Sequence, residues 1–249
     1  MDGLIRFLHT SGTCHVRTHG IGTPKAYAQN YSPAFWIQSM PFVYSTDALS
    51  NLRDTISRAR LSPYVLASKG DLALAINLYE YNTLLSQGLY GVLQSLEIAF
   101  RNSLHRTLGQ GIGLDWYERA PFRQAELDSI EDAKNKILRR SDAITPGRIV
   151  AELNFGFWTF LVSSEYEKKL WVPHLHKAFP HLHKPDREMI FRRFKSIKGL
   201  RNAIAHHEPI LARDLFRDYT NIIEALDWIC PTTATWVQAT NRFTRYLSK

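Results

Sequence analysis

The residues best suited to chemistry lie together in the segment LRNAIAHHEPI, residues 200–210. Arg201 provides a planar, permanently charged fork that fits phosphate oxygens. His206 and the adjacent His207 can both accept and donate a proton near neutral pH. In a helix, Asn202 and His206 are four residues apart and share a face. Such a group could break a phosphodiester bond without a metal ion.

This cluster is expected at the C-terminal end of a helix. Pro209 disfavours helical geometry at Glu208, so the helix should stop there. The negative end of the helix dipole favours a protonated imidazole at that place. A structural interpretation explains the two histidines as cations that stabilise the helix end, but it explains Arg201 and Asn202 less well. From the residues alone, both interpretations stay open.

A second cluster of similar composition, RNSLH, occupies residues 101–105. It lies deep within a long apolar pattern that also contains Glu97. Arg101 and Glu97 are four residues apart, which is the spacing of an ordinary ion pair that stabilises a helix. The structural interpretation is the stronger one for this cluster.

The segment HLHKAFPHLH, residues 174–183, resembles a metal site more than any other part of the chain. Prolines interrupt it, and no acidic residue near it precedes Asp186 to orient an imidazole. We therefore expect a solvated loop that contacts phosphates, and no metal site. The chain also lacks the GxSxG, P-loop and HExxH motifs of serine hydrolases, nucleoside-triphosphatases and zinc peptidases.

The composition of the chain makes nucleic acid a candidate partner. The 249 residues carry a formal net charge of +8, which attracts polyanions. Two distant cysteines, Cys14 and Cys230, cannot build a disulfide scaffold, which favours a reducing, cytoplasmic location. Polar residues and prolines interrupt the uncharged run over residues 26–46, so no membrane-spanning segment is expected.

Hydrophobic periodicity predicts an all-α protein that positions these clusters. Residues 1–44 lack periodicity and are expected to form a poorly structured N-terminal arm, whereas residues 45–249 are expected to form one helical domain. Gly109, Gly111 and Gly113 are interpreted as a C-cap and loop. The aromatic residues 155–160 are expected in the core, because no basic residue accompanies them in the sequence. Pro63 is expected to end the first helical element, Asp71 to cap the long helix after it, and Thr145-Pro146 to begin another helix. The expected helices cover residues 45–60, 72–108, 121–140, a stretch that begins at 145–146, 185–206, 212–230 and 231–247.

Four ordered blocks of this sequence resemble the Abi-like (abortive phage infection) family of HEPN proteins. Arg201, Asn202 and His206 match the family's motif of an arginine and a histidine separated by four to six residues. The blocks are LEIAFRN at 96–102, AELNFGFWTFL at 151–161, LRNAIAHHEPI at 200–210 and DWICP at 227–231. The similarity extends from about residue 61 to 242 and leaves residues 1–44 outside.

The resemblance implies a HEPN-like helical bundle that cleaves RNA without a metal or other cofactor, in phage defence or as a toxin. Arg201 and His206 would be the catalytic pair, Asn202 its polar companion, and His207 an alternative register of the motif. Glu97, Arg101 and Asn102 match the family's first-helix block, and we expect them to support the site.

Cleavage by the 2′-hydroxyl of RNA needs a base, an acid and positive charge on the phosphoryl oxygens. One His206 cannot easily serve both sides of an in-line displacement, so a homodimer that apposes two helix ends is expected. An antitoxin protein or a regulatory RNA would be a further partner. The alternatives are a helical module that binds RNA or a nucleotide without cutting it, and a purely structural helical protein.

Overall fold

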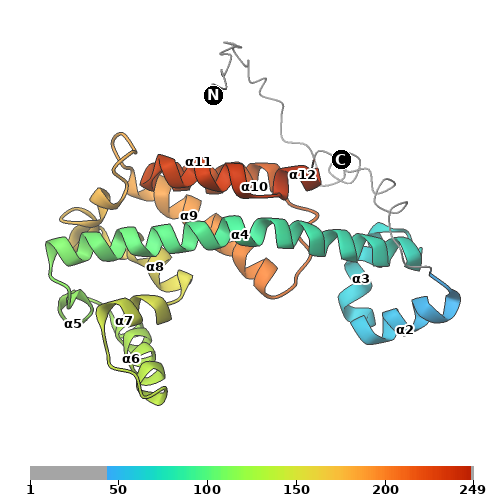
Figure 1. The fold of residues 1–249 in the computed structure, drawn as a ribbon, viewed down its shortest axis with the longest axis horizontal. Helices are drawn as coiled ribbons and strands as arrows, with labels where there is room; N and C mark the ends of the chain where they lie inside the picture. Colours follow the sequence, from blue (N-terminus) through green and yellow to red (C-terminus); the bar gives the residue numbers. More distant parts are fainter. Residues whose placement is uncertain (1–43, 248–249) are drawn as a thin grey trace, which may run out of the picture.

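The structure, a computed structural model, describes residues 44–247, and this part of the chain is built of helices without any strand. The all-α prediction is confirmed (Figure 1). The arm predicted over residues 1–44 lies, except for Tyr44, outside the described residues. The main helices are α2 Thr46–Ile56, α3 Arg58–Ala67, α4 Leu72–Gly111, α5 Trp116–Arg119, α6 Gln124–Arg139, α7 Pro146–Glu152, α8 Phe155–Leu161, α9 Arg187–Ala205, α10 Leu215–Ile229, α11 Pro231–Thr240 and α12 Phe243–Leu247. Three short turns of 3₁₀ or π type, η2 Ser164–Tyr166, η3 Glu167–Trp171 and η4 Leu175–Ala178, precede α9.

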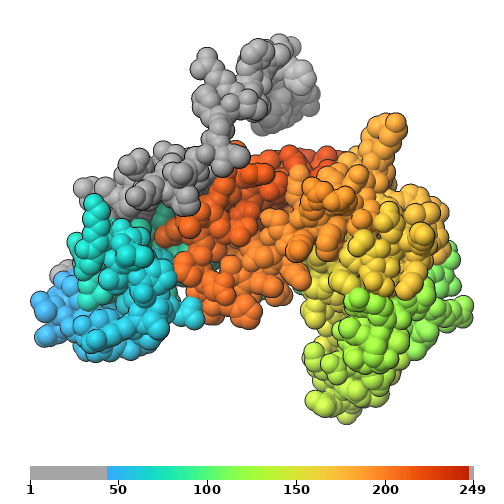
Figure 2. All heavy atoms as spheres, turned by 180° about the vertical axis from the view of Figure 1, so that it is seen from behind, coloured from blue at the N-terminus to red at the C-terminus, as the bar shows by residue number. Residues whose placement is uncertain are grey.

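Helix α4 is the axis of the fold. Its 40 residues span about 60 Å. The predicted cap is confirmed, because the side chain of Asp71 accepts a hydrogen bond from the N–H of Leu74 at 3.0 Å. Figure 1 shows α10 to α12 along one side of α4, α9 crossing behind α4, α5 to α8 near its C-terminal end, and α2 and α3 near its N-terminal end. Seen from behind in Figure 2, the orange segment around the end of α9 meets the blue α2 and α3.

The core forms around the C-terminal half of α4. The buried ring of Phe100 stacks on Phe194 of α9, with ring centroids 3.8 Å apart. Phe155 and Phe179 pack at the edges of the same group. The expectation that the aromatic segment 155–160 is core holds for Phe155, Phe157 and Trp158, whereas Phe160 is only partly buried.

The prediction that Pro63 ends the first helical element is wrong. Pro63 lies inside α3, and the chain instead breaks at Ser57, whose φ is +86°. The Ser57 hydroxyl then accepts a hydrogen bond from the N–H of Arg60 and begins α3. Pro63 is the sixth of the ten residues of α3, so the helix lacks one backbone hydrogen bond there, and the burial of Leu61 and Tyr64 offsets this loss. Buried Leu61 and Tyr64 anchor α3 on α4.

The glycines of α4 have two different roles. At Gly88 a Cβ would lie 3.0 Å from the Tyr246 ring of α12, so glycine permits the close contact of the two helices. Gly109 and Gly111 were predicted in a cap and loop, but α4 continues through both because Ile112 still packs against the core. The loop begins at Gly113, whose φ of +130° favours glycine.

The last predicted helix is divided in two. Asn241 separates α11 from α12, since its Nδ2 donates to the carbonyl of Val237 at 2.8 Å and its Oδ1 accepts from the N–H of Phe243 at 3.0 Å. Of the helices within residues 44–247, none is long and apolar enough to cross a membrane. The uncharged run at 26–46 lies almost wholly outside this range.

Candidate functional site

Helix α9 ends at the predicted place, in a Schellman-type C-cap. His206 is the cap residue, and its N–H donates to the carbonyl of Asn202 at 2.9 Å. The N–H of Glu208 donates to the carbonyl of Ala203 at 2.8 Å. His207 takes the left-handed position between them, with φ +56°. Glycine is usual there, and another residue costs on the order of 1 kcal/mol, so the choice of histidine favours a role for its side chain.

Two side chains far away in the sequence hold this helix end. Arg60 of α3 donates from Nη1 to the carbonyl of His207 at 2.5 Å and to that of His206 at 3.4 Å. Asn82 of α4 is buried; its Oδ1 accepts from the N–H of Ile210 at 2.7 Å. The tip of α9 is therefore fixed by the N-terminal half of the fold, and Arg60 adds positive charge beside the histidines.

The Asn82 contact can be tested by stability. Asn82→Ala leaves the buried N–H of Ile210 without its acceptor, so we expect the free energy of unfolding to fall by about 1–3 kcal/mol. Urea unfolding of the full chain measures this. Asn135→Ala, at an exposed position of α6, is the matched control and should change stability by less than about 0.5 kcal/mol. Equal effects of the two substitutions would show that Asn82 does not hold the turn.

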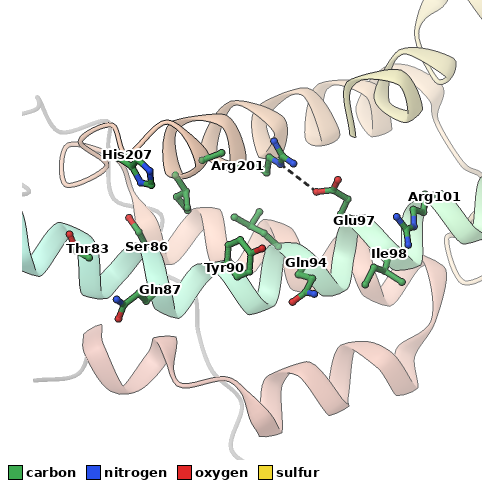
Figure 3. A pocket seen from close by; sticks show the side chains of 13 residues that line it. Thr83, Ser86, Gln87, Tyr90, Gln94, Glu97, Ile98, Arg101, Arg201 and His207 are labelled. Atoms are coloured by element: carbon green, nitrogen blue, oxygen red, sulfur yellow. Dashed lines mark ion pairs between the residues drawn. The ribbon is translucent and has the colours of Figure 1, made fainter. Parts of the chain in front are cut away.

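A cleft of about 730 Å³ lies between α4 and α9 beside this tip. Figure 3 shows Glu97 and Arg101 reaching it from α4, and Arg201 and His207 from the side of α9. Exposed Tyr90 lines the same cleft.

The ion pair in the cleft differs from the one that the sequence suggested. Glu97 Oε2 lies 3.4 Å from Arg201 Nε, so the helix-internal pair of Glu97 with Arg101 is replaced by a pair between α4 and α9. Both side chains are partly exposed, at 24% for Glu97 and 40% for Arg201. Arg101 Nε is buried without a hydrogen-bond partner among the described residues. The cleft thus holds two guanidinium groups and one carboxylate.

The structure does not gather all the predicted site residues in one cleft. His206 and Asn202 are exposed and lie outside the cleft lining, at the outer side of the same helix end. Asn102 lines a separate cleft of about 540 Å³ with Arg106 and Lys177.

His105 has a structural role. Its Nδ1 accepts a hydrogen bond from Trp116 Nε1 at 2.8 Å, and burial lowers the pKa of its imidazole. The structural interpretation of the RNSLH cluster is therefore confirmed for this residue.

The prediction of a solvated loop over residues 174–183 is wrong for its first half, because Leu175, Ala178 and Phe179 are buried in the core and anchor a 3₁₀ turn. His176 Nδ1 lies 3.1 Å from the carbonyl of Trp171, and the N–H of His181 donates to the carbonyl of Trp228. Within residues 44–247, no three His, Cys, Asp or Glu side chains are grouped so that they could hold a metal ion.

Sequence reasoning missed Arg60, Asn82 and Tyr90. A signal for Asn82 was available, since it is a polar residue among the leucines of the core-facing side of α4. No comparable signal exists for Arg60, whose partners lie 146 and 147 residues away. Comparison of the chain with protein-family models, curated proteins and solved structures finds no match.

Proposed function

We propose that this protein is an endoribonuclease of the Abi-like HEPN type that cleaves RNA without a metal ion. The observation that supports this best is the end of α9: Arg201 and His207 line one open cleft, and exposed His206 lies next to His207 at the outer side of the same helix end. The His207 imidazole and the Arg201 guanidinium are thus accessible to one substrate in the cleft, with His206 at its edge.

The proposed reaction is an in-line displacement. The imidazole of His206 takes the proton of the 2′-hydroxyl while O2′ forms a bond to phosphorus, and the bond from phosphorus to the 5′-oxygen breaks. A second imidazole gives the 5′-oxygen its proton. Arg201 and Arg101 stabilise the negative charge on the phosphoryl oxygens, and Glu97 orients the Arg201 guanidinium. The products are a 2′,3′-cyclic phosphate and a 5′-hydroxyl end.

The second imidazole is proposed to come from a two-fold related copy of the chain. His206 is exposed at the tip of α9, where an isologous contact would place the same histidine of both copies at one groove. Such an enzyme would act in phage defence or as a toxin, restrained by an antitoxin protein or a regulatory RNA.

The chemistry of the cleavage products tests this proposal. Purified full-length protein should leave 5′-hydroxyl ends on RNA, with or without EDTA, because the side chains and the substrate supply every reacting group. A strand with a single 2′-deoxy nucleotide at the scissile position should resist cutting there, since it lacks the nucleophile. Efficient cleavage of that strand, or products with 5′-phosphate ends, would contradict the mechanism.

The second candidate is a module that binds RNA or a nucleotide without cutting it. The Glu97–Arg201 pair favours it, because a carboxylate already occupies part of the arginine fork. This candidate predicts tight binding of RNA and no new RNA ends under any condition of the test above.

A further inference from the structure

The outer face of α9 carries a continuous row of polar and aromatic side chains. The row consists of Phe191, Lys195, Lys198, Asn202 and His206, spaced by three or four residues, so that all point to the same side of the helix. The buried residues Ile190, Phe194, Ile197, Leu200 and Ile204 occupy the opposite side. The row ends at the proposed catalytic histidine, and its length from Lys195 is about 16 Å.

The two lysines of this row differ from the other cations of α9. Arg192 pairs with Glu188, and Arg193 pairs with Glu224 of α10 at 2.6 Å. Lys195 and Lys198, in contrast, form no ion pair with any described residue. No carboxylate of the described residues neutralises them; Lys195 Nζ lies 6.0 Å from the centroid of the Phe191 ring, and both charges are available to a polyanion.

An aromatic cleft opens beside the lysines. It has a volume of about 410 Å³, lies between α6, α8 and α9, and is lined by Phe160 and Phe191 as well as by both lysines. In Figure 2, orange α9 borders the yellow and green surface that carries α8 and α6. Both phenylalanine rings are only partly buried. Partly exposed aromatic rings beside cations can stack the bases of single-stranded nucleic acids.

The acidic residue of this cleft does not oppose a polyanion. Glu126 is buried, and its carboxylate accepts hydrogen bonds from the Tyr166 hydroxyl at 2.5 Å and from Arg123 Nε at 3.3 Å. Arg123 in turn lies over the Phe160 ring, 4.3 Å from its centroid. The Glu126 charge is thus compensated inside the protein, and the rim of the cleft is positive.

We propose that this face of α9 is the substrate track for single-stranded RNA. Lys195 and Lys198 bind successive phosphates, a base enters the cleft between Phe160 and Phe191, and the strand continues along Asn202 to His206. This inference rests on the proposed function only for the direction of the strand, because binding itself needs no cleavage. Duplex RNA is excluded from the cleft, since its bases are not free to stack on the rings.

The test measures binding of a fluorescent, 2′-O-methylated single-stranded RNA to the full-length chain by anisotropy at several salt concentrations. This RNA cannot be cut by 2′-hydroxyl attack. For Lys195→Gln/Lys198→Gln we expect about tenfold weaker binding. The slope of the logarithm of the binding constant against the logarithm of the salt concentration should fall in magnitude by about 1.4, because each lost phosphate contact lowers it by about 0.7. Phe191→Leu should weaken binding at least about fivefold by removing a stacking face.

The matched control is Lys136→Gln/Lys168→Gln, which removes the same charge at two exposed lysines that belong neither to α9 nor to the lining of the aromatic cleft. It should bind like the wild type. Three results would contradict the proposal. They are equal losses of affinity in both double variants, displacement of the RNA by poly-glutamate as readily as by unlabelled RNA, and no binding of RNA by the wild type.

The two proposals fail separately. If the wild type binds RNA through Lys195 and Lys198 but does not cut it, the proposed RNA-binding face is supported and the proposed nuclease activity is wrong. If the wild type cuts RNA and the lysine variants bind and cut RNA equally well, the nuclease activity is supported and the proposed RNA-binding face is wrong.

Discussion

Alanine at His206 is expected to slow RNA cleavage by about 10²- to 10⁴-fold, which is the contribution of a general acid or base. Arg201→Ala should cost about 10²- to 10³-fold, because it removes one preorganised charge from the phosphoryl oxygens. Both positions lie at the surface end of α9, so the fold should survive both substitutions. Initial rates on a defined single-stranded RNA, with folding checked by circular dichroism, measure these effects.

The matched control is His183→Ala, at an exposed histidine of the loop before α9. It should retain the wild-type rate. In a bacterial host, growth arrest and new 5′-hydroxyl RNA ends should appear with the wild type and the control, and be absent with the His206 and Arg201 variants. If all four proteins behave alike in both assays, the end of α9 does not perform the chemistry.

Phe100→Ala is expected to lower the free energy of unfolding by about 3–5 kcal/mol, the largest stability effect anticipated in this chain. The ring is fully buried and stacks on Phe194 at 3.8 Å, with Phe155 and Phe179 around it. Its removal leaves a cavity at the place where α4 meets α8 and α9. Urea unfolding followed by circular dichroism gives the difference.

Phe216→Ala is the control for this substitution, since the same ring at 63% exposure stabilises little. We expect a change within about 0.5 kcal/mol. Because Phe100 lies next to Arg101 and contacts α9, its loss should also reduce cleavage under conditions where the variant is still folded. A Phe100 variant as stable as the Phe216 variant would contradict the described core.

Much of the local structure follows from the sequence. Asp71 caps α4 and Thr145 caps α7 with Pro146 in its first turn, as the sequence predicts. These signals are readable because a cap acts on backbone groups three residues away. The predicted helix end at Pro63 is wrong because it considered only the local effect of proline. The burial of Leu61 and Tyr64 against α4 outweighs the helix-breaking tendency of Pro63.

The sequence by itself determined that the chain is helical, that Arg201 and His206 lie near one helix end, and where that helix stops. Only the tertiary structure decided which side chains surround that end. It pairs Glu97 with Arg201, and it holds the tip through Arg60 and Asn82.

The aromatic segment shows the same division. The sequence places no lysine near Phe160, whereas the fold brings Lys195 and Lys198 of α9 beside it. The physical reason is the range of the interactions. Caps, helix periodicity and proline effects act within about one turn, so neighbouring residues reveal them. The partner of each helix face depends on how all apolar faces are buried together, and a single stretch of sequence does not encode that.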